Sequence, residues 1–114
     1  MGQEDDVDPR MEMSIGGASG RTIVRVAGEV DYLTSPRLAD GLEAVLAGGA
    51  GWVEVEFTEV SFCDCAALGI LMQARQKAQA AGARLRLRGS FQPSVSRLLA
   101  VMELTSVLTA TNSR

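Results

Sequence analysis

The chain has 114 residues, of which 46% are hydrophobic and 4% aromatic, and its formal charge is −3. This length predicts a single domain with one hydrophobic core. The acidic balance argues against nucleic acid or an anionic membrane surface as the main partner. No segment has the roughly 18 consecutive apolar residues of a membrane span. The chain contains no histidine, so the commonest general base and metal ligand is missing.

Hydrophobic periodicity divides the chain into strand-like and helical segments. A period of two residues predicts strands over 11–15, 22–27, 52–57 and 83–88. A period near 3.6 residues predicts helices over 36–47, 66–81 and roughly 93–102. Residues 107–110 could form a last short strand or the start of a tail. Helices between the later strands imply parallel crossovers within a mixed sheet, so the predicted class is α/β.

The turns and ends of these segments carry their own signals. The glycine-rich stretch 16–20 is predicted to close a hairpin between the first two strands. It is not a phosphate-binding loop, because it joins two strands and lacks a Gly-Lys-Ser/Thr ending. Ser35 is a plausible N-cap for the first helix, with Pro36 at the first helical position. The acidic first ten residues, MGQEDDVDPR, are unlike a signal peptide; we interpret 1–10 as a flexible arm and 11–114 as the domain.

One face of the predicted sheet is charged. Alternation places Glu54 and Glu56 on one side of the third strand, and Arg84 and Arg86 on one side of the fourth. A helix joins these strands, so we expect them to be parallel neighbours with their charges side by side. Each exposed pair would contribute only ~0.2–1 kcal/mol.

Two short motifs stand where strands end. The first is Gly28-Glu29-Val30-Asp31, and the second is VSFCDCAALG at 60–69, where the third strand meets the second helix. Together they resemble the STAS domain family, most closely the bacterial anti-sigma-factor antagonists. The family motifs are Gly-Glu-hydrophobic-Asp and hydrophobic-x-Phe-hydrophobic-Asp-Ser-Ser-Gly-Leu-Gly. The resemblance covers about residues 11–110 and implies a STAS-type single domain: a mixed four- to five-stranded sheet with helices packed mainly on one face.

The resemblance also implies a function. Such an antagonist binds an anti-sigma factor, usually an ATP-dependent serine kinase, and thereby frees a sigma factor for transcription. The kinase phosphorylates the second serine of Asp-Ser-Ser-Gly and so breaks the complex. By this resemblance the protein is a bacterial, cytoplasmic regulator without cofactor, metal, nucleic-acid or membrane partner, and is a monomer or weak dimer. The implied partner-binding residues are Asp31, Thr34, Ser35, Asp64, Cys65, Ala66, Ala67, Leu68 and Gly69.

This chain departs from the family at the switch itself. Ala66 falls on the phosphoserine position and has no hydroxyl, so phosphorylation there is impossible. The protein should therefore behave as a permanently unphosphorylated form, whether the alanine is natural or engineered. Ser61 and Thr58 are nearby hydroxyls, but they lie before the helix and outside the Asp-Ser-Ser-Gly positions.

The two cysteines of the second motif leave an alternative open. Two reduced thiols are typical of a cytoplasmic protein, and they are too few and too close for a zinc site. Cys65, at a helix N-terminus, is a candidate redox residue, but it could also be a small substitute for serine. Cys63 should be buried and inert.

Two other classes of function remain to be compared with this one: catalysis, and a different role for the same fold. Catalysis by Cys65 would need an activating base, and none is evident in the sequence. We therefore expect that this protein is not an enzyme. The alternative within the same fold is a STAS subunit of a lipid-transport ATPase or of a signalling scaffold. Neither needs a phosphorylatable residue at position 66.

Overall fold

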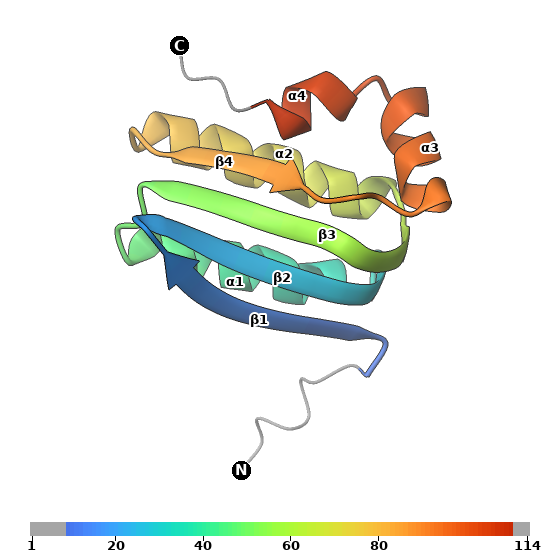
Figure 1. Cartoon of the computed structure of the whole chain (residues 1–114), viewed down its shortest axis with the longest axis horizontal. Coiled ribbons are helices and arrows are strands. Elements are labelled where there is room, and N and C mark those ends of the chain that lie inside the picture. The colour runs from blue at the N-terminus through green and yellow to red at the C-terminus, as the bar shows by residue number, and fades with distance from the viewer. Residues whose placement is uncertain (1–8, 111–114) are drawn as a thin grey trace.

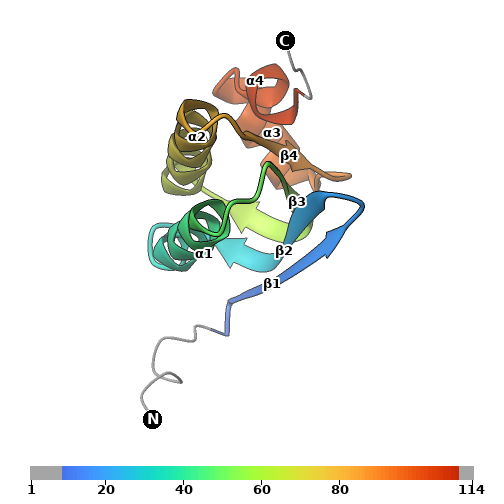
Figure 2. The same cartoon turned by 90° about the vertical axis from the view of Figure 1, so that its left-hand side faces the viewer.

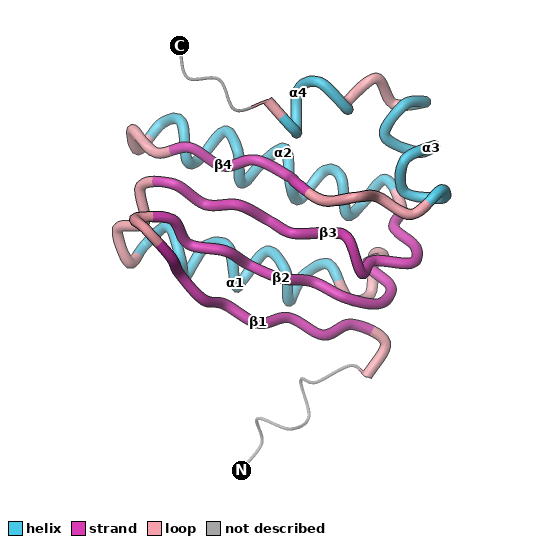
Figure 3. Tube along the Cα trace, in the orientation of Figure 1, coloured by secondary structure: helices cyan, strands magenta, loops and turns pink. Residues whose placement is uncertain are grey.

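The sheet has four strands in the order β1-β2-β3-β4, with α1 and α2 packed side by side on one face (Figures 1 and 2). The structure, a computed structural model, describes residues 9–110. Figure 3 shows the alternation of strands and helices along the chain. The strands are β1 (Met11–Ala18), β2 (Arg21–Val30), β3 (Trp52–Cys63) and β4 (Arg84–Arg88). The helices are α1 (Ser35–Ala47), α2 (Cys65–Ala80), α3 (Pro93–Val101) and α4 (Thr105–Thr109).

The predicted fold class is confirmed. The strand β1 is antiparallel to β2, whereas β2, β3 and β4 are parallel, as the intervening helices require. The core lies between the sheet and the two long helices, where Val55, Phe57, Leu42 and Leu71 are fully buried or nearly so. Over the described residues, no helix is both long enough and apolar enough to cross a bilayer.

The hairpin and the C-terminal segment differ from their predictions. Strands β1 and β2 extend through most of 16–20, leaving only Ser19 and Gly20 as the turn, with φ values of 56° and 81°. Two consecutive positive φ values are typical of the two-residue turns that match strand twist. Residues 107–110 form no fifth strand, because α4 packs on β4 there and buries Leu108 completely.

Strand β2 also continues further than predicted, through Val30. Gly28 has φ +96°, and a Cβ at this position would lie 2.0 Å from the carbonyl oxygen of Arg10. Only glycine allows the backbone of Arg10 to approach this closely. The approach lets Glu29 N–H donate a hydrogen bond of 2.8 Å to Arg10 C=O. The backbone of Arg10, in the turn before β1, is thereby hydrogen-bonded to β2. Residues 1–8 of the predicted arm lie outside the described residues.

The charged face of the sheet has the predicted register but not the predicted exposure. Glu54 pairs with Arg86 across the parallel strands β3 and β4. However, Glu54 is completely buried, although we expected an exposed ion pair. Its carboxylate accepts hydrogen bonds from Arg86 at 3.1 Å and Arg88 at 2.8 Å, and Arg21 lies 3.3 Å away. Three long guanidinium side chains, from Arg21, Arg86 and Arg88, cover the carboxylate on this side of the sheet.

Candidate interaction site at the carboxyl ends of β2 and β3

The two sequence motifs meet at one corner of the molecule, because β2 and β3 are parallel and end at the same edge. Val30 and Cys63 are neighbours in register, and Asp64 N–H donates to Val30 C=O at 3.3 Å. Asp64 then caps α2: its carboxylate accepts a hydrogen bond of 3.0 Å from Ala67 N–H. The other carboxylate oxygen accepts one of 3.1 Å from Tyr32 N–H. One side chain thus joins the start of α2 to the loop after β2.

Asp31 organises that loop from within. Its carboxylate accepts hydrogen bonds from the backbone N–H groups of Leu33 and Thr34, at 2.9 and 3.1 Å, and from Arg10 at 3.0 Å. Desolvation acts to raise the pKa of Asp31, but these backbone hydrogen bonds and the charge of Arg10 together hold it below its ordinary value. The carboxylate therefore stabilises the loop in an Asx-type turn, and its hydrogen bonds are made within the chain rather than to a partner.

The structure brings all the predicted site residues to this corner but exposes only some of them. Thr34, Ser35, Ala67 and Leu68 are buried, so their side chains cannot contact a partner directly. Thr34, for example, donates to Glu29 C=O and accepts from Asp31 N–H, both at 2.9 Å. Asp31 and Asp64 are half-buried. The predicted residues that remain exposed are Cys65, Ala66 and Gly69.

The corner also exposes four larger apolar side chains, of which only Phe62 lies within a motif. Tyr32 and Leu33, in the loop after β2, are 68% and 58% exposed, and Phe62 is 46% exposed. Met102, just after α3, is 42% exposed, and its sulfur lies 3.9 Å from that of Cys65. We call this set the corner surface: Tyr32, Leu33, Phe62, Cys65, Ala66, Gly69 and Met102.

Helix α3 reaches the corner surface because β4 is short. Beyond Arg88 the chain leaves the sheet, and α3 packs beside the last part of β3. Gln92 donates to Thr58 C=O at 3.3 Å, and Ser94 donates to Ser61 C=O at 2.8 Å. The sequence contained one signal for the missed residues: Tyr32 and Leu33 are apolar residues in a loop directly after a motif.

The two cysteines have different environments. Both are free thiols, Cys63 buried and Cys65 exposed. Burial raises the pKa of the Cys63 thiol to about 11, and the charge of Asp64 adds to the shift. Cys63 is therefore protonated and inert at neutral pH, and any thiol chemistry at this corner belongs to Cys65.

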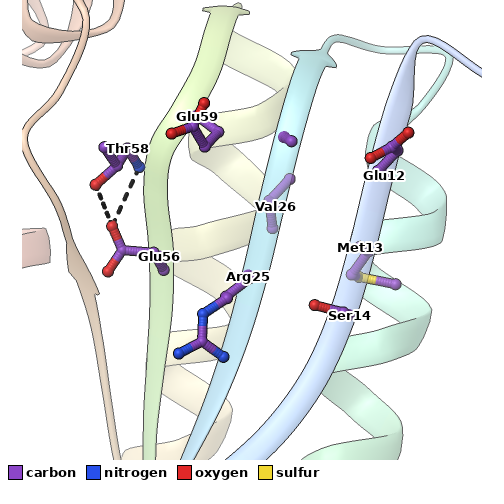
Figure 4. Close-up of a pocket in the computed structure, with 9 residues that line it drawn as sticks. Glu12, Met13, Ser14, Arg25, Val26, Glu56, Thr58 and Glu59 are labelled. Carbon is purple, nitrogen blue, oxygen red and sulfur yellow. Dashed lines mark hydrogen bonds between the residues drawn. The ribbon is translucent and has the colours of Figure 1, made fainter.

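A hollow of about 570 Å³ lies elsewhere, on the sheet face opposite α1 and α2 (Figure 4). Its lining includes Ala27, which pairs in register with Glu12 of β1 and with Glu59 of β3. Figure 4 shows Arg25 extending on the side of Glu56. None of the predicted site residues lines it. Its lining contains no cysteine, and within residues 9–110 no three metal-ligating side chains come together.

A small mixed sheet, backed by two helices and carrying both motifs at one corner, defines an α/β domain of one known architecture. The chain belongs to the STAS domain family: the family model described as "Mlab, STAS domain" matches residues 13–109. Among curated proteins there is no significant match.

Solved structures confirm the fold. An anti-sigma factor antagonist from Mycobacterium paratuberculosis superimposes with a TM-score of 0.77 at 21% identity, covering 89% of this chain and 86% of the other. The anti-sigma factor antagonist SpoIIAA in its unphosphorylated form gives 0.64 at 17% identity, covering 82% and 83%. The Bacillus cell fate determinant SpoIIAA in its phosphorylated form gives 0.66 at 14% identity, covering 90% and 93%.

Proposed function

We propose that this protein binds an anti-sigma factor of the ATP-dependent serine-kinase type through the corner surface, and thereby frees a sigma factor for transcription. The observation that carries the proposal is the double hydrogen bond of Asp64, to Tyr32 N–H and Ala67 N–H. It joins both family motifs into one surface. The names of the similar structures point the same way, since two of them are called anti-sigma factor antagonists.

The corner surface has the chemistry of a protein-binding site. Aromatic and methionine side chains are enriched in the centres of interfaces, and the corner exposes Tyr32, Phe62 and Met102. The small residues Ala66 and Gly69 let a partner approach the first turns of α2 closely. Asp31 and Asp64 are already satisfied by hydrogen bonds within the chain. Their proposed role is therefore to hold the surface in shape rather than to attract a basic partner.

We also propose that the protein stays permanently in the unphosphorylated, binding-competent state. Ala66 is exposed in the first turn of α2, at the place where the family resemblance puts the phosphoserine. A methyl group cannot accept a phosphoryl group, so the kinase cannot release this protein by phosphorylating that position. Binding should persist while ATP is present.

The remaining parts of the proposal follow from the same reasoning. The protein acts by binding and not by catalysis, without a cofactor, a nucleic-acid partner or a membrane partner. It works in the cytoplasm, where its two free thiols stay reduced. It acts as a monomer or weak dimer.

Capture of partners from the source cell tests the proposal. The double variant Tyr32→Ser, Leu33→Ser removes two exposed apolar side chains of the corner surface. The matched control is Ile15→Ser in β1, since Ile15 is 52% exposed and lies outside the corner surface. Wild type and the control should retain a sigma-regulating kinase-like protein, whereas the double variant should lose it. If all three proteins retain it equally, the corner surface is not the binding site.

The same experiment separates the alternative function, a STAS subunit of a lipid-transport ATPase or of a signalling scaffold. Ala66 favours this alternative, because such subunits need no phosphoryl acceptor. Capture of an ABC-type ATPase, with no kinase-like protein, would establish the lipid-transport role and exclude the anti-sigma role.

A further inference from the structure

The sheet face opposite α1 and α2 carries half of the chain's ten arginines. Strand β2 contributes Arg21 and Arg25, and β4 contributes Arg84, Arg86 and Arg88. In register, Arg84, Arg86 and Arg88 pair with Trp52, Glu54 and Glu56 of β3, and Arg25 also pairs with Glu56. The alternate residues Val53 and Val55 of β3 are buried in the core. We call the five arginines, Arg21, Arg25, Arg84, Arg86 and Arg88, the arginine face.

Three of the arginines are held in place by the two glutamates. Burial alone would raise the pKa of Glu54, but hydrogen bonds from Arg88 and Arg86 hold it below its ordinary value, so the group is ionised at neutral pH. Arg88 also lies 2.8 Å from Glu56. Arg21 stacks on the ring of Trp52, with 5.4 Å between guanidinium carbon and ring centroid. These contacts pre-organise the guanidinium groups.

The glutamates do not balance the charge of this face. The sheet face carries these five arginines and four glutamates, Glu12, Glu54, Glu56 and Glu59, which leaves an excess of one positive charge, in a chain whose net charge is −3. The guanidinium carbon of Arg84 also lies over the ring of Trp52, 5.2 Å from the ring centroid. The side chain of Arg25 is exposed and makes no hydrogen bond or ion pair within the described residues. The carboxylates of Glu12 and Glu59 line the hollow of Figure 4 together with Arg25 and Glu56.

A second hollow, of about 840 Å³, opens at the held arginines. Arg21, Arg86 and Arg88 line it, together with the carboxylate of Glu56, which is ion-paired with Arg88. Ser90, from the segment after β4, and Thr105 and Thr109, from α4, also line it and add hydroxyl groups. The volume is within the range of small-molecule sites. Guanidinium forks and hydroxyls are the groups that bind phosphate oxygens.

We propose that this hollow binds a small molecule carrying a phosphate group, with Arg21 and Arg88 as its principal contacts. Glu54 acts as the positioning residue, because its buried carboxylate accepts hydrogen bonds from both Arg21 and Arg88. The site lies on a different part of the surface from the corner surface, and it does not depend on the function proposed for that corner.

Titration calorimetry with inorganic pyrophosphate and with glycerol 3-phosphate, at constant ionic strength, tests the site. The wild-type protein should bind at least one probe saturably. Loss of a charge-assisted hydrogen bond in Arg88→Gln should weaken that binding roughly tenfold. Arg97→Gln is the matched control: it makes the same change of charge, but Arg97 is exposed on α3 and does not line the hollow. The control should bind within about twofold of wild type.

Arg21→Lys provides a second measurement in case Arg88→Gln disturbs the fold. It keeps the charge of Arg21, which is the outermost of the three contacts to Glu54, and removes only the fork. Binding should again weaken roughly tenfold, with an unchanged thermal midpoint. Two results would overturn the proposal. One is the absence of saturable binding to both probes. The other is an equal loss in Arg97→Gln, which would indicate general attraction of anions to surface charge.

Discussion

The carboxylate of Asp64 accepts a hydrogen bond from the backbone N–H of Tyr32, at 3.1 Å, across 32 residues of sequence. Because the same carboxylate caps α2 through Ala67 N–H, the loop after β2 and the start of α2 form one unit. Charge reversal at Asp64 is therefore a poor test of docking alone, since it would also remove a helix cap.

Removing the Asp64 side chain should destabilise the protein. Asp64→Ala loses the cap of α2 and the link to Tyr32, and we expect the free energy of unfolding to fall by about 1–2 kcal/mol. Denaturant unfolding followed by circular dichroism measures this. The control Asp40→Ala, at an exposed position of α1, should stay within about 0.5 kcal/mol of wild type. An unfolding midpoint for Asp64→Ala equal to that of the control would show that the cap is energetically irrelevant.

Gly69→Ala should separate stability from binding. Gly69 is exposed within α2, and a Cβ there would meet no atom within 4 Å. The helix should gain about 0.8–1 kcal/mol from the better propensity of alanine. If a partner packs closely on this turn, its affinity should fall although the domain is more stable. Gln76→Ala, exposed two turns further along α2, should leave affinity unchanged. Unchanged affinity in both variants would place the partner away from this turn.

Ala66→Ser should create the missing phosphoryl acceptor. With a cognate kinase-type anti-sigma factor and labelled ATP, the wild-type protein should take up no phosphate within residues 64–69, and its complex should persist. The serine variant should take up phosphate and dissociate, because a phosphate adds roughly −1.5 to −2 charges to the interface. Helix propensity changes by less than ~1 kcal/mol, so the domain should stay folded.

Two other results of this labelling experiment would change the interpretation. Label on Ser61 or Thr58 of the wild-type protein would mean that the switch has moved rather than disappeared. Neither labelling nor release of the serine variant would mean that the partner is not a kinase of this type.

Glu54 should contribute stability that depends on pH. Its pKa is lower in the folded protein than in the unfolded chain, so the unfolded state binds more protons in acid. The stabilisation is therefore fully present above a pH of about 4.5, the ordinary value for glutamate, and is lost as pH falls through the folded pKa. Glu54→Gln should lower the free energy of unfolding at pH 7 by about 1–3 kcal/mol. It should also flatten the acid limb of the stability profile, whereas Glu43→Gln, exposed on α1, should leave that limb unchanged.

The two thiols should react differently with Ellman's reagent. In the native protein one thiol per chain, that of Cys65, should react at pH 8. The second, Cys63, is buried with a pKa of about 11 and should react only after denaturation. The variant Cys65→Ser should show no reactive thiol in the native state. A native count of two would contradict the burial of Cys63.

Local sequence patterns were sufficient to predict most of the fold. The three long helices begin and end within two residues of their predicted bounds, because apolar spacing and the helix-starting prolines Pro36 and Pro93 act over a few neighbouring residues. The pairing of Glu54 with Arg86 was also predictable, because a helical crossover makes β3 and β4 parallel neighbours. So was the meeting of both motifs at one edge, which follows from parallel strands.

Tertiary structure alone decided what is exposed and what is bonded. Alternation placed Glu54 on the outer face, but three arginines from two other strands converge on it and bury it, and no local pattern predicts that convergence. Thr34 and Ser35 looked like surface residues of a helix start, yet the packing of α1 against the sheet buries both. Met102 joins the corner surface only because a short β4 lets α3 pack beside β3. Burial depends on contacts between segments distant in sequence, whereas periodicity reports only the side of an element on which a residue stands.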